Sequence, residues 1–228
     1  MSWLGLGLAL LGPFALALLG EGKRGGPVGL AGALAGEALY VALVALVLWI
    51  AFVPAGLTAE ALGLRPLRWQ SLAWGAVLLA FFQYAYGPVV VLALRRLGVS
   101  GFEAGLAKMR GLPLWYLVLA VLVGGTAEEL LYRGYAIAQL EQLGAGVWLA
   151  ALLPLLVFTF AHVPLWGLAP ALTTFLGGGV FTLFFLWQRD LGPNVIAHVA
   201  TDLVGIALAR RSRQKAKNAP TNQYQSSR

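Results

Sequence analysis

The chain contains no cysteine and few charged residues. Of its 228 residues, 11% are charged and 60% are hydrophobic, and the mean hydropathy is +0.80. A soluble domain has about 25% charged and about 45–50% apolar residues. The absence of cysteine excludes disulfides, thiolate metal sites, a cysteine nucleophile and a C-terminal prenylation box. The scarcity of charge predicts a polytopic membrane protein instead of a soluble domain.

Apolar segments are spread evenly along the chain, and most reach the roughly 20 residues that a helix needs to cross a bilayer. We expect an all-α, polytopic transmembrane helical bundle of about seven spans, with six and eight as the alternatives. Residues 1–209 would form a single integral-membrane domain, and residues 210–228 a basic, polar, disordered tail. A glycine triplet at 177–179 would let two helices approach closely. The expected spans are residues 2–20, 28–53, 70–94, 112–135, 145–163, 165–187 and 192–209.

The formal net charge of +7 comes largely from basic residues between Arg210 and Lys217. They follow the last apolar segment directly, where the positive-inside rule expects them. We therefore expect membrane lipid, and no nucleic acid, as a partner. The distribution of basic residues predicts an outside N-terminus and a cytoplasmic C-terminus. The absence of an organellar presequence indicates a prokaryotic plasma membrane.

Three ionisable residues, Glu128, Glu129 and Arg133, follow the apolar run from Leu112 to Ala127. A charge at bilayer depth costs at least about 2.5 kcal/mol on insertion scales, so these residues are expected to have a specific role. Glu129 and Arg133 are four residues apart and can pair on one helical face. Glu128 points about 100° away, toward a different neighbour. The alternative for the pair is a structural lock between two helices.

Both histidines of the chain, His162 and His198, lie within apolar segments. Phe158 precedes His162 by one turn and would help to fix its ring. Asp202 follows His198 by four residues, so that its carboxylate would orient the imidazole. The alternative for His162 is a helix-end residue that is hydrogen-bonded to a carbonyl. The alternative for His198 and Asp202 is a polar clamp between helices. Strict alternation of the spans puts Glu128 and His198 in the outer half of the membrane but His162 near the inner end of its span.

Three known types of intramembrane protease do not fit the sequence. The H-E-x-x-H pattern of zinc proteases is absent. A paired-aspartate protease needs two aspartates at membrane depth, but Asp190 falls in an expected loop, which leaves only Asp202. The tetrapeptide at 98–101 matches the short G-x-S-G of rhomboid proteases, yet it lies in a polar connection. A glutamate–histidine centre remains.

Such a centre permits more than one function. A buried carboxylate can activate water, and a neighbouring imidazole can donate to a developing oxyanion. Alternatively, Glu128, His162 and His198 would hold a divalent metal such as zinc. Buried glutamates and histidines also build proton relays, so a proton-coupled transporter is a further alternative. Glu37, inside another span, is interpreted as structural or as lining a cavity.

The residues fall into three ordered motifs: EExxxR at 128–133, FxxxH at 158–162 and HxxxD at 198–202. In these motifs the chain resembles the CPBP family of CAAX proteases and bacteriocin-processing enzymes, also called Abi, which includes the type II CAAX prenyl endopeptidases. The resemblance covers about residues 112–209, which would be the catalytic core. Asp202 stands where the prenyl proteases carry Asn, and its charge would stabilise a cationic His198.

This resemblance implies an intramembrane endopeptidase. Glu128 would activate water with help from His162, while His198 and Asp202 would stabilise the oxyanion of the tetrahedral intermediate. The other two residues of the first motif would brace the site. The substrate would be a peptide or protein, lipidated or membrane-anchored. Family members are often labelled metalloproteases, and a metal-free glutamate mechanism is also argued. Some members act as scaffolds or immunity factors, so a non-catalytic role is the alternative.

Overall fold

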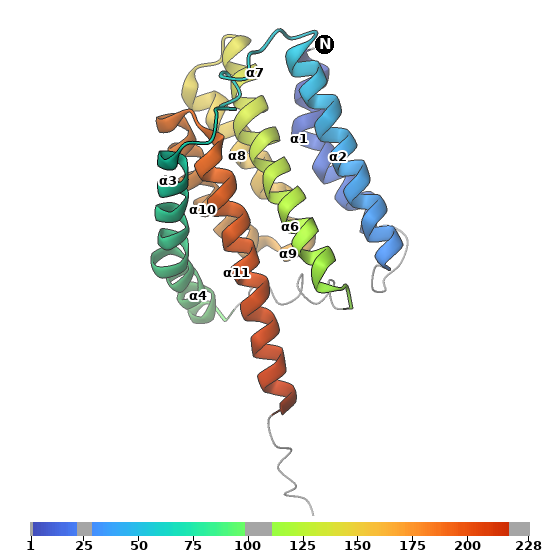
Figure 1. Cartoon of the computed structure of the whole chain (residues 1–228), viewed down its shortest axis with the longest axis vertical. Helices are drawn as coiled ribbons and strands as arrows, with labels where there is room; N and C mark the ends of the chain where they lie inside the picture. The colour runs from blue at the N-terminus through green and yellow to red at the C-terminus, as the bar shows by residue number, and fades with distance from the viewer. Residues whose placement is uncertain (1, 22–28, 99–110, 219–228) are drawn as a thin grey trace, which may run out of the picture.

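The computed structural model describes residues 2–21, 29–98 and 111–218, and these residues contain helices but no strands (Figure 1). The all-α prediction is therefore confirmed. The serine of the G-x-S-G tetrapeptide and residues 219–228 of the tail lie outside the described residues.

Seven apolar helical segments run up and down through the bundle (Figure 1). The first residues of α1 and the last residues of α11 lie at opposite ends of the bundle, as an odd number of crossings requires. Five segments are long and apolar enough to cross a membrane, and two are shorter apolar helices, α1 (Ser2–Glu21) and α8 (Val147–Ala161). The chain is thus an integral membrane protein, and the expectation of about seven spans is confirmed.

The five longer segments are α2 (Leu30–Phe52), α3 (Trp69–Phe81) with the π-helical turn η1 (Phe82–Tyr86) and α4 (Gly87–Arg96), α6 (Leu114–Glu128) with η2 (Glu129–Ala136) and α7 (Ile137–Gln142), α10 (Leu168–Gln188) and α11 (Leu191–Asn218). The short helix α9 (Val163–Trp166) joins α8 to α10.

The fourth segment continues to Gln142, beyond the expected boundary at residue 135. Its last turns stay helical although they are polar, because their side chains find partners inside the protein. Gln139 Nε2 donates to Gln142 Oε1 at 3.0 Å, and Gln142 Nε2 donates to the Ala55 carbonyl at 2.9 Å. Glu128 consequently lies midway along this segment and not near its outer end.

One further expectation needs correction. The C-terminal tail was expected to be disordered from residue 210, but α11 remains helical to Asn218 and extends beyond the bundle (Figure 1). Alanine, arginine, glutamine and lysine are good helix formers, and cations near a helix C-terminus interact favourably with its dipole. Arg133, in contrast to the basic residues at the end of α11, is buried inside the bundle at 1% exposure.

The main apolar core lies where α1, α2, η2, α7 and α8 meet. Most of η2 belongs to it: Leu131, Tyr132 and Tyr135 are at most 2% exposed. The segment that carries the first motif is therefore packed on several sides, which gives its polar side chains fixed positions.

Candidate active site

The first motif lies at a junction between an α-helix and a π-helical turn. α6 ends at Glu128, and η2 begins at Glu129. Single π-helical turns inside α-helices occur frequently at functional sites. The side chains of the two neighbouring glutamates have different surroundings, since Glu129 is 0% exposed and Glu128 is 24% exposed. Only Glu128 is accessible from outside the protein.

The Glu129 carboxylate is held by three donors from two helical segments. Arg133 Nη1 donates to Oε1 at 3.0 Å, His198 Nδ1 lies 2.9 Å from the same oxygen, and Asn194 Nδ2 donates to Oε2 at 3.0 Å. A buried charge requires such partners, because an isolated one is very costly. The expected pair of Glu129 and Arg133 is present, and it connects η2 with α11 through His198 and Asn194.

Arg133 extends this network toward α10 and α8. Its Nη2 donates to the Gly178 carbonyl at 3.2 Å, and its Nε donates to Thr182 Oγ1 at 3.4 Å. The guanidinium lies over the Phe158 ring, 4.4 Å from the centroid, at cation–π distance. A Cβ on Gly178 would lie 2.9 Å from Arg133 Nη2 and 3.0 Å from Leu155 Cδ1. At Gly178, therefore, α10 approaches the side chains of η2 and α8 closely, as the glycine triplet predicts.

His162 lies at the end of α8 and is held both by the Phe158 ring, as the FxxxH spacing predicts, and by a backbone carbonyl, as the alternative of a helix-end histidine predicts. The Phe158 carbonyl lies 2.7 Å from His162 Nδ1, and the two ring centroids are 4.5 Å apart. Because a carbonyl only accepts, Nδ1 carries the proton and Nε2 is the acceptor of the neutral ring. Within the described residues no hydrogen bond or ion pair joins His162 to Glu128, His198 or Asp202. The structure thus leaves His162 outside the ion-paired cluster that surrounds His198.

His198 is the centre of the cluster. Its Nδ1 lies against Glu129, and its Nε2 lies 3.6 Å from Glu128 Oε2 and 3.8 Å from Asp202 Oδ2. Both Nε2 distances are too long for hydrogen bonds. The Phe181 ring stacks on the imidazole at 5.3 Å between centroids. Nε2 is therefore held between two carboxylates and remains available to a further group.

Asn194 is a residue of this network that the sequence interpretation missed. It is 0% exposed, and its Nδ2 donates to the Phe181 carbonyl at 2.9 Å as well as to Glu129. Asn194, His198 and Asp202 recur every four residues along α11. This spacing is the signal that would have found Asn194, because residues four apart share one face of a helix.

The described residues fit a metal site poorly. No group of three His, Cys, Asp or Glu side chains among them is placed to hold a metal ion. His198 Nδ1 is bonded to Glu129 and His162 Nδ1 to a backbone carbonyl, so Nε2 is the free nitrogen of both rings, as it would be in a metal ligand. The expected ligand set of Glu128, His162 and His198 does not converge on one point. In the function proposed below, the side chains carry the chemistry themselves.

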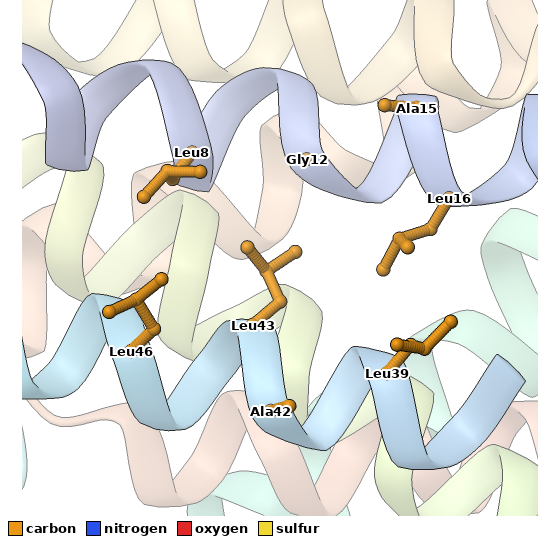
Figure 2. Close-up of a pocket in the computed structure, with 8 residues that line it drawn as sticks. All are labelled: Leu8, Gly12, Ala15, Leu16, Leu39, Ala42, Leu43 and Leu46. Carbon is orange, nitrogen blue, oxygen red and sulfur yellow. The ribbon is translucent and has the colours of Figure 1, made fainter. Parts of the chain in front are cut away.

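A separate apolar groove of about 310 Å³ lies between α1 and α2 (Figure 2). None of its lining side chains is titratable, so the groove is not where the predicted chemistry would occur. The lining residues are Leu8, Gly12, Ala15, Leu16, Leu39, Ala42, Leu43 and Leu46.

A comparison with known protein families matches the part of the chain that carries the three motifs. Residues 110–204 match the family model described as "Type II CAAX prenyl endopeptidase Rce1-like". A search of curated proteins and a search of solved structures gave no match. The matched segment contains all three motifs and agrees closely with the expected core at 112–209. Residues 110–204 are therefore similar to the Rce1-like family, and the chain as a whole is an integral membrane protein.

Proposed function

We propose that the chain is a membrane-embedded endopeptidase that hydrolyses a peptide bond with a water molecule activated by Glu128. The observation that carries this proposal is the contrast between the two glutamates. Glu129 is fully buried and satisfied, whereas Glu128 is partly exposed and has no hydrogen-bond partner in the described part of the chain. A carboxylate that is accessible and uncommitted, 3.6 Å from a histidine nitrogen, is suited to general-base catalysis.

The reaction would follow general acid–base chemistry. Glu128 takes a proton from water while the water oxygen bonds to the carbonyl carbon, and the carbonyl electron pair moves onto its oxygen. The tetrahedral intermediate then collapses: the C=O bond reforms, the C–N bond breaks, and Glu128 returns the proton to the leaving nitrogen. A single carboxylate thus acts first as base and then as acid.

His198 would stabilise the oxyanion of that intermediate. Since its Nδ1–H is donated to Glu129, only a ring protonated at both nitrogens has an Nε2–H to donate. The carboxylates of Glu128, Glu129 and Asp202 around the ring would support this charged form. His162, with Nε2 as its free acceptor, would help to orient the water.

The substrate would be a peptide or protein that reaches the site from the membrane, either membrane-anchored or lipidated. Prenylated CAAX peptides are one class to test, because the matched family is described by that activity. We further propose a prokaryotic plasma membrane as the location, with the basic end of α11 in the cytoplasm and in contact with anionic lipid.

The test is cleavage of a fluorogenic peptide library, with prenylated members, by the detergent-purified protein supplied with lipid. Glu128→Gln would lower kcat by at least about 10²-fold, and His162→Ala would lower it as well. Glu60→Gln makes the same chemical change at an exposed residue between α2 and α3 and should cleave like the wild type.

Absence of cleavage by folded wild-type protein would overturn the endopeptidase proposal. A scaffold of the same family would keep its cellular phenotype in Glu128→Gln. A proton-coupled transporter would instead show pH-driven solute flux in liposomes that this substitution abolishes.

A further inference from the structure

A stack of aromatic rings leads to His198. The Phe181 ring of α10 lies 5.3 Å from the imidazole, measured between centroids, with 21° between the two planes. The Phe82 ring of η1 stacks on Phe181 in turn, at 4.6 Å and 20°. Both phenylalanines are buried, with at most 6% of their surface exposed. Three near-parallel rings from α11, α10 and η1 are therefore packed in series, and the series ends at the proposed oxyanion donor.

The hydrogen bond to Glu129 does not by itself fix where His198 Nε2 points. His198 Nδ1 lies 2.9 Å from Glu129 Oε1, but a hydrogen bond tolerates misalignment and χ2 of histidine is a broad torsion. A ring held at one atom can pivot, and such a pivot would move Nε2 away from Glu128 Oε2, which is 3.6 Å distant. The contact with the Phe181 ring restricts this motion, because protein interiors are close-packed.

Phe181 is itself held by the network around Glu129. Its carbonyl accepts a hydrogen bond from Asn194 Nδ2 at 2.9 Å, and the same Nδ2 donates to Glu129 Oε2 at 3.0 Å. Asn194 precedes His198 by four residues on α11. The carboxylate that holds the edge of the imidazole and the phenylalanine that stacks on it are thus joined through one buried amide.

The Phe82 ring reaches Phe181 beside a glycine of α10. A Cβ on Gly177 would lie 3.4 Å from Phe82 Cε1 and 3.2 Å from the Tyr86 hydroxyl. That hydroxyl donates to the Thr173 carbonyl and joins η1 to α10. η1 lies outside the segment that matches the family model. The first half of the chain therefore supports the site that the three motifs describe.

We propose that Phe181 is a positioning residue whose ring, supported by Phe82, holds the His198 imidazole with Nε2 directed at the reacting carbonyl oxygen beside Glu128. Phe181 acts through His198 and not on the substrate. Positioning of this kind affects the rate because a misplacement of about 1 Å can cost about 10²-fold. This inference rests on the proposed endopeptidase function and adds to it two residues from outside the motifs.

The test is Phe181→Leu, which keeps an apolar side chain and removes the ring. We expect kcat to fall by about 10- to 100-fold, whereas KM should change less than about threefold, because the substrate keeps its own contacts. Phe82→Leu removes the second ring and should lower kcat by a smaller factor. The matched control is Phe184→Leu on the same helix, because the Phe184 ring packs edge-on against Trp74 and Trp187. This control should cleave like the wild type.

Nuclear magnetic resonance separates positioning from packing. The chain has two histidines, so isotope-labelled histidine gives two sets of ring signals, and His162→Ala identifies those of His198. In the wild type and in Phe184→Leu, the His198 Nδ1 proton should exchange slowly with water, because it is bonded to Glu129. In Phe181→Leu this proton should exchange faster, since the ring opens more often from its hydrogen bond.

The outcomes separate the two proposals. If the wild type cleaves and Glu128→Gln does not, but Phe181→Leu keeps the wild-type kcat, the role of Phe181 is refuted while the endopeptidase stands. Equal falls of kcat in Phe181→Leu and Phe184→Leu, or a fall with an unchanged His198 signal, would make Phe181 a packing residue and would also refute the proposal. If Phe181→Leu does not fold, Phe82→Leu decides by the same criteria. If the wild type cleaves nothing, both proposals are overturned together.

Discussion

Glu129 and Arg133 form an ion pair inside the π-helical turn of the fourth span, with 3.0 Å between Oε1 and Nη1 and neither side chain more than 1% exposed. The pair is the point where four helical segments meet, because Arg133 also contacts α8 and α10 and Glu129 contacts α11. A buried pair need not add net stability, but losing one partner leaves an uncompensated charge.

Arg133→Met should therefore destabilise the protein by about 3–5 kcal/mol. Arg189→Met is the control, because Arg189 forms a salt bridge with Glu141 at 2.8 Å whose side chains are 34% and 29% exposed. Screening by solvent limits such a pair to about 0–1 kcal/mol. Thermal unfolding in detergent measures the stability of both variants. Equal losses of stability would contradict the claim that removing a buried ion-pair partner costs more than removing a partly exposed one.

Gly178→Ala should lower stability and activity together. The new Cβ would lie 2.9 Å from Arg133 Nη2 and displace the guanidinium from its partners, and overpacking of this kind costs about 1–3 kcal/mol. Gly179→Ala is the neighbouring control, since its Cβ would meet nothing closer than Leu155 Cδ2 at 3.8 Å. Gly179→Ala should be neutral or slightly stabilising, because alanine favours a helix over glycine. A comparable effect of both substitutions on the unfolding temperature would contradict this geometry.

Asn194→Asp changes few atoms but should lower both stability and activity. It replaces the donor Nδ2 with an oxygen that faces Glu129 Oε2 and the Phe181 carbonyl, so two hydrogen bonds are lost and two carboxylates meet. Removing a buried hydrogen-bond partner leaves a penalty of about 1–3 kcal/mol. We expect a fall in both thermal midpoint and kcat, and a variant that unfolds like the wild type would show that Asn194 does not hold Glu129.

Asp202→Asn, in contrast, should retain most of the activity. The Asp202 side chain is 48% exposed, and its Oδ2 is 3.8 Å from His198 Nε2, beyond hydrogen-bonding distance. We expect kcat to fall by less than about tenfold, since the Coulomb energy of one charge at that distance is modest in a partly solvated site. Steady-state cleavage measures this, and inactivity of Asp202→Asn beside an active Asp190→Asn would disprove it.

Metal removal gives a further prediction. Because no three ligand side chains converge in the described residues, prolonged treatment with a chelator should leave the rate of peptide cleavage unchanged. Loss of activity that returns only on addition of zinc would contradict this expectation and would require a third ligand, such as His162, to approach Glu128 and His198.

The sequence predicted the parts of the structure that depend on neighbours along the chain. Composition and segment length gave the all-α bundle, because only helices satisfy their backbone within an apolar run. Four-residue spacing predicted the pair of Glu129 with Arg133 and the contact between the Phe158 and His162 rings, since residues one turn apart lie side by side. The same reasoning identified the three motifs that lie in the segment similar to the Rce1-like family.

Contacts between distant segments were decided only by the tertiary structure. Asn194 and Glu129 are 65 residues apart, and no local pattern states that one will satisfy the other. The extension of the fourth span depends on a bond from Gln142 to Ala55, in a loop after the second span. Glu37 and Tyr116 are 79 residues apart, and only the packing of α2 against α6 brings the Tyr116 hydroxyl within 3.2 Å of the Glu37 carboxylate. Spacing along a helix fixes which residues share a face, whereas the packing of the helices decides what that face meets.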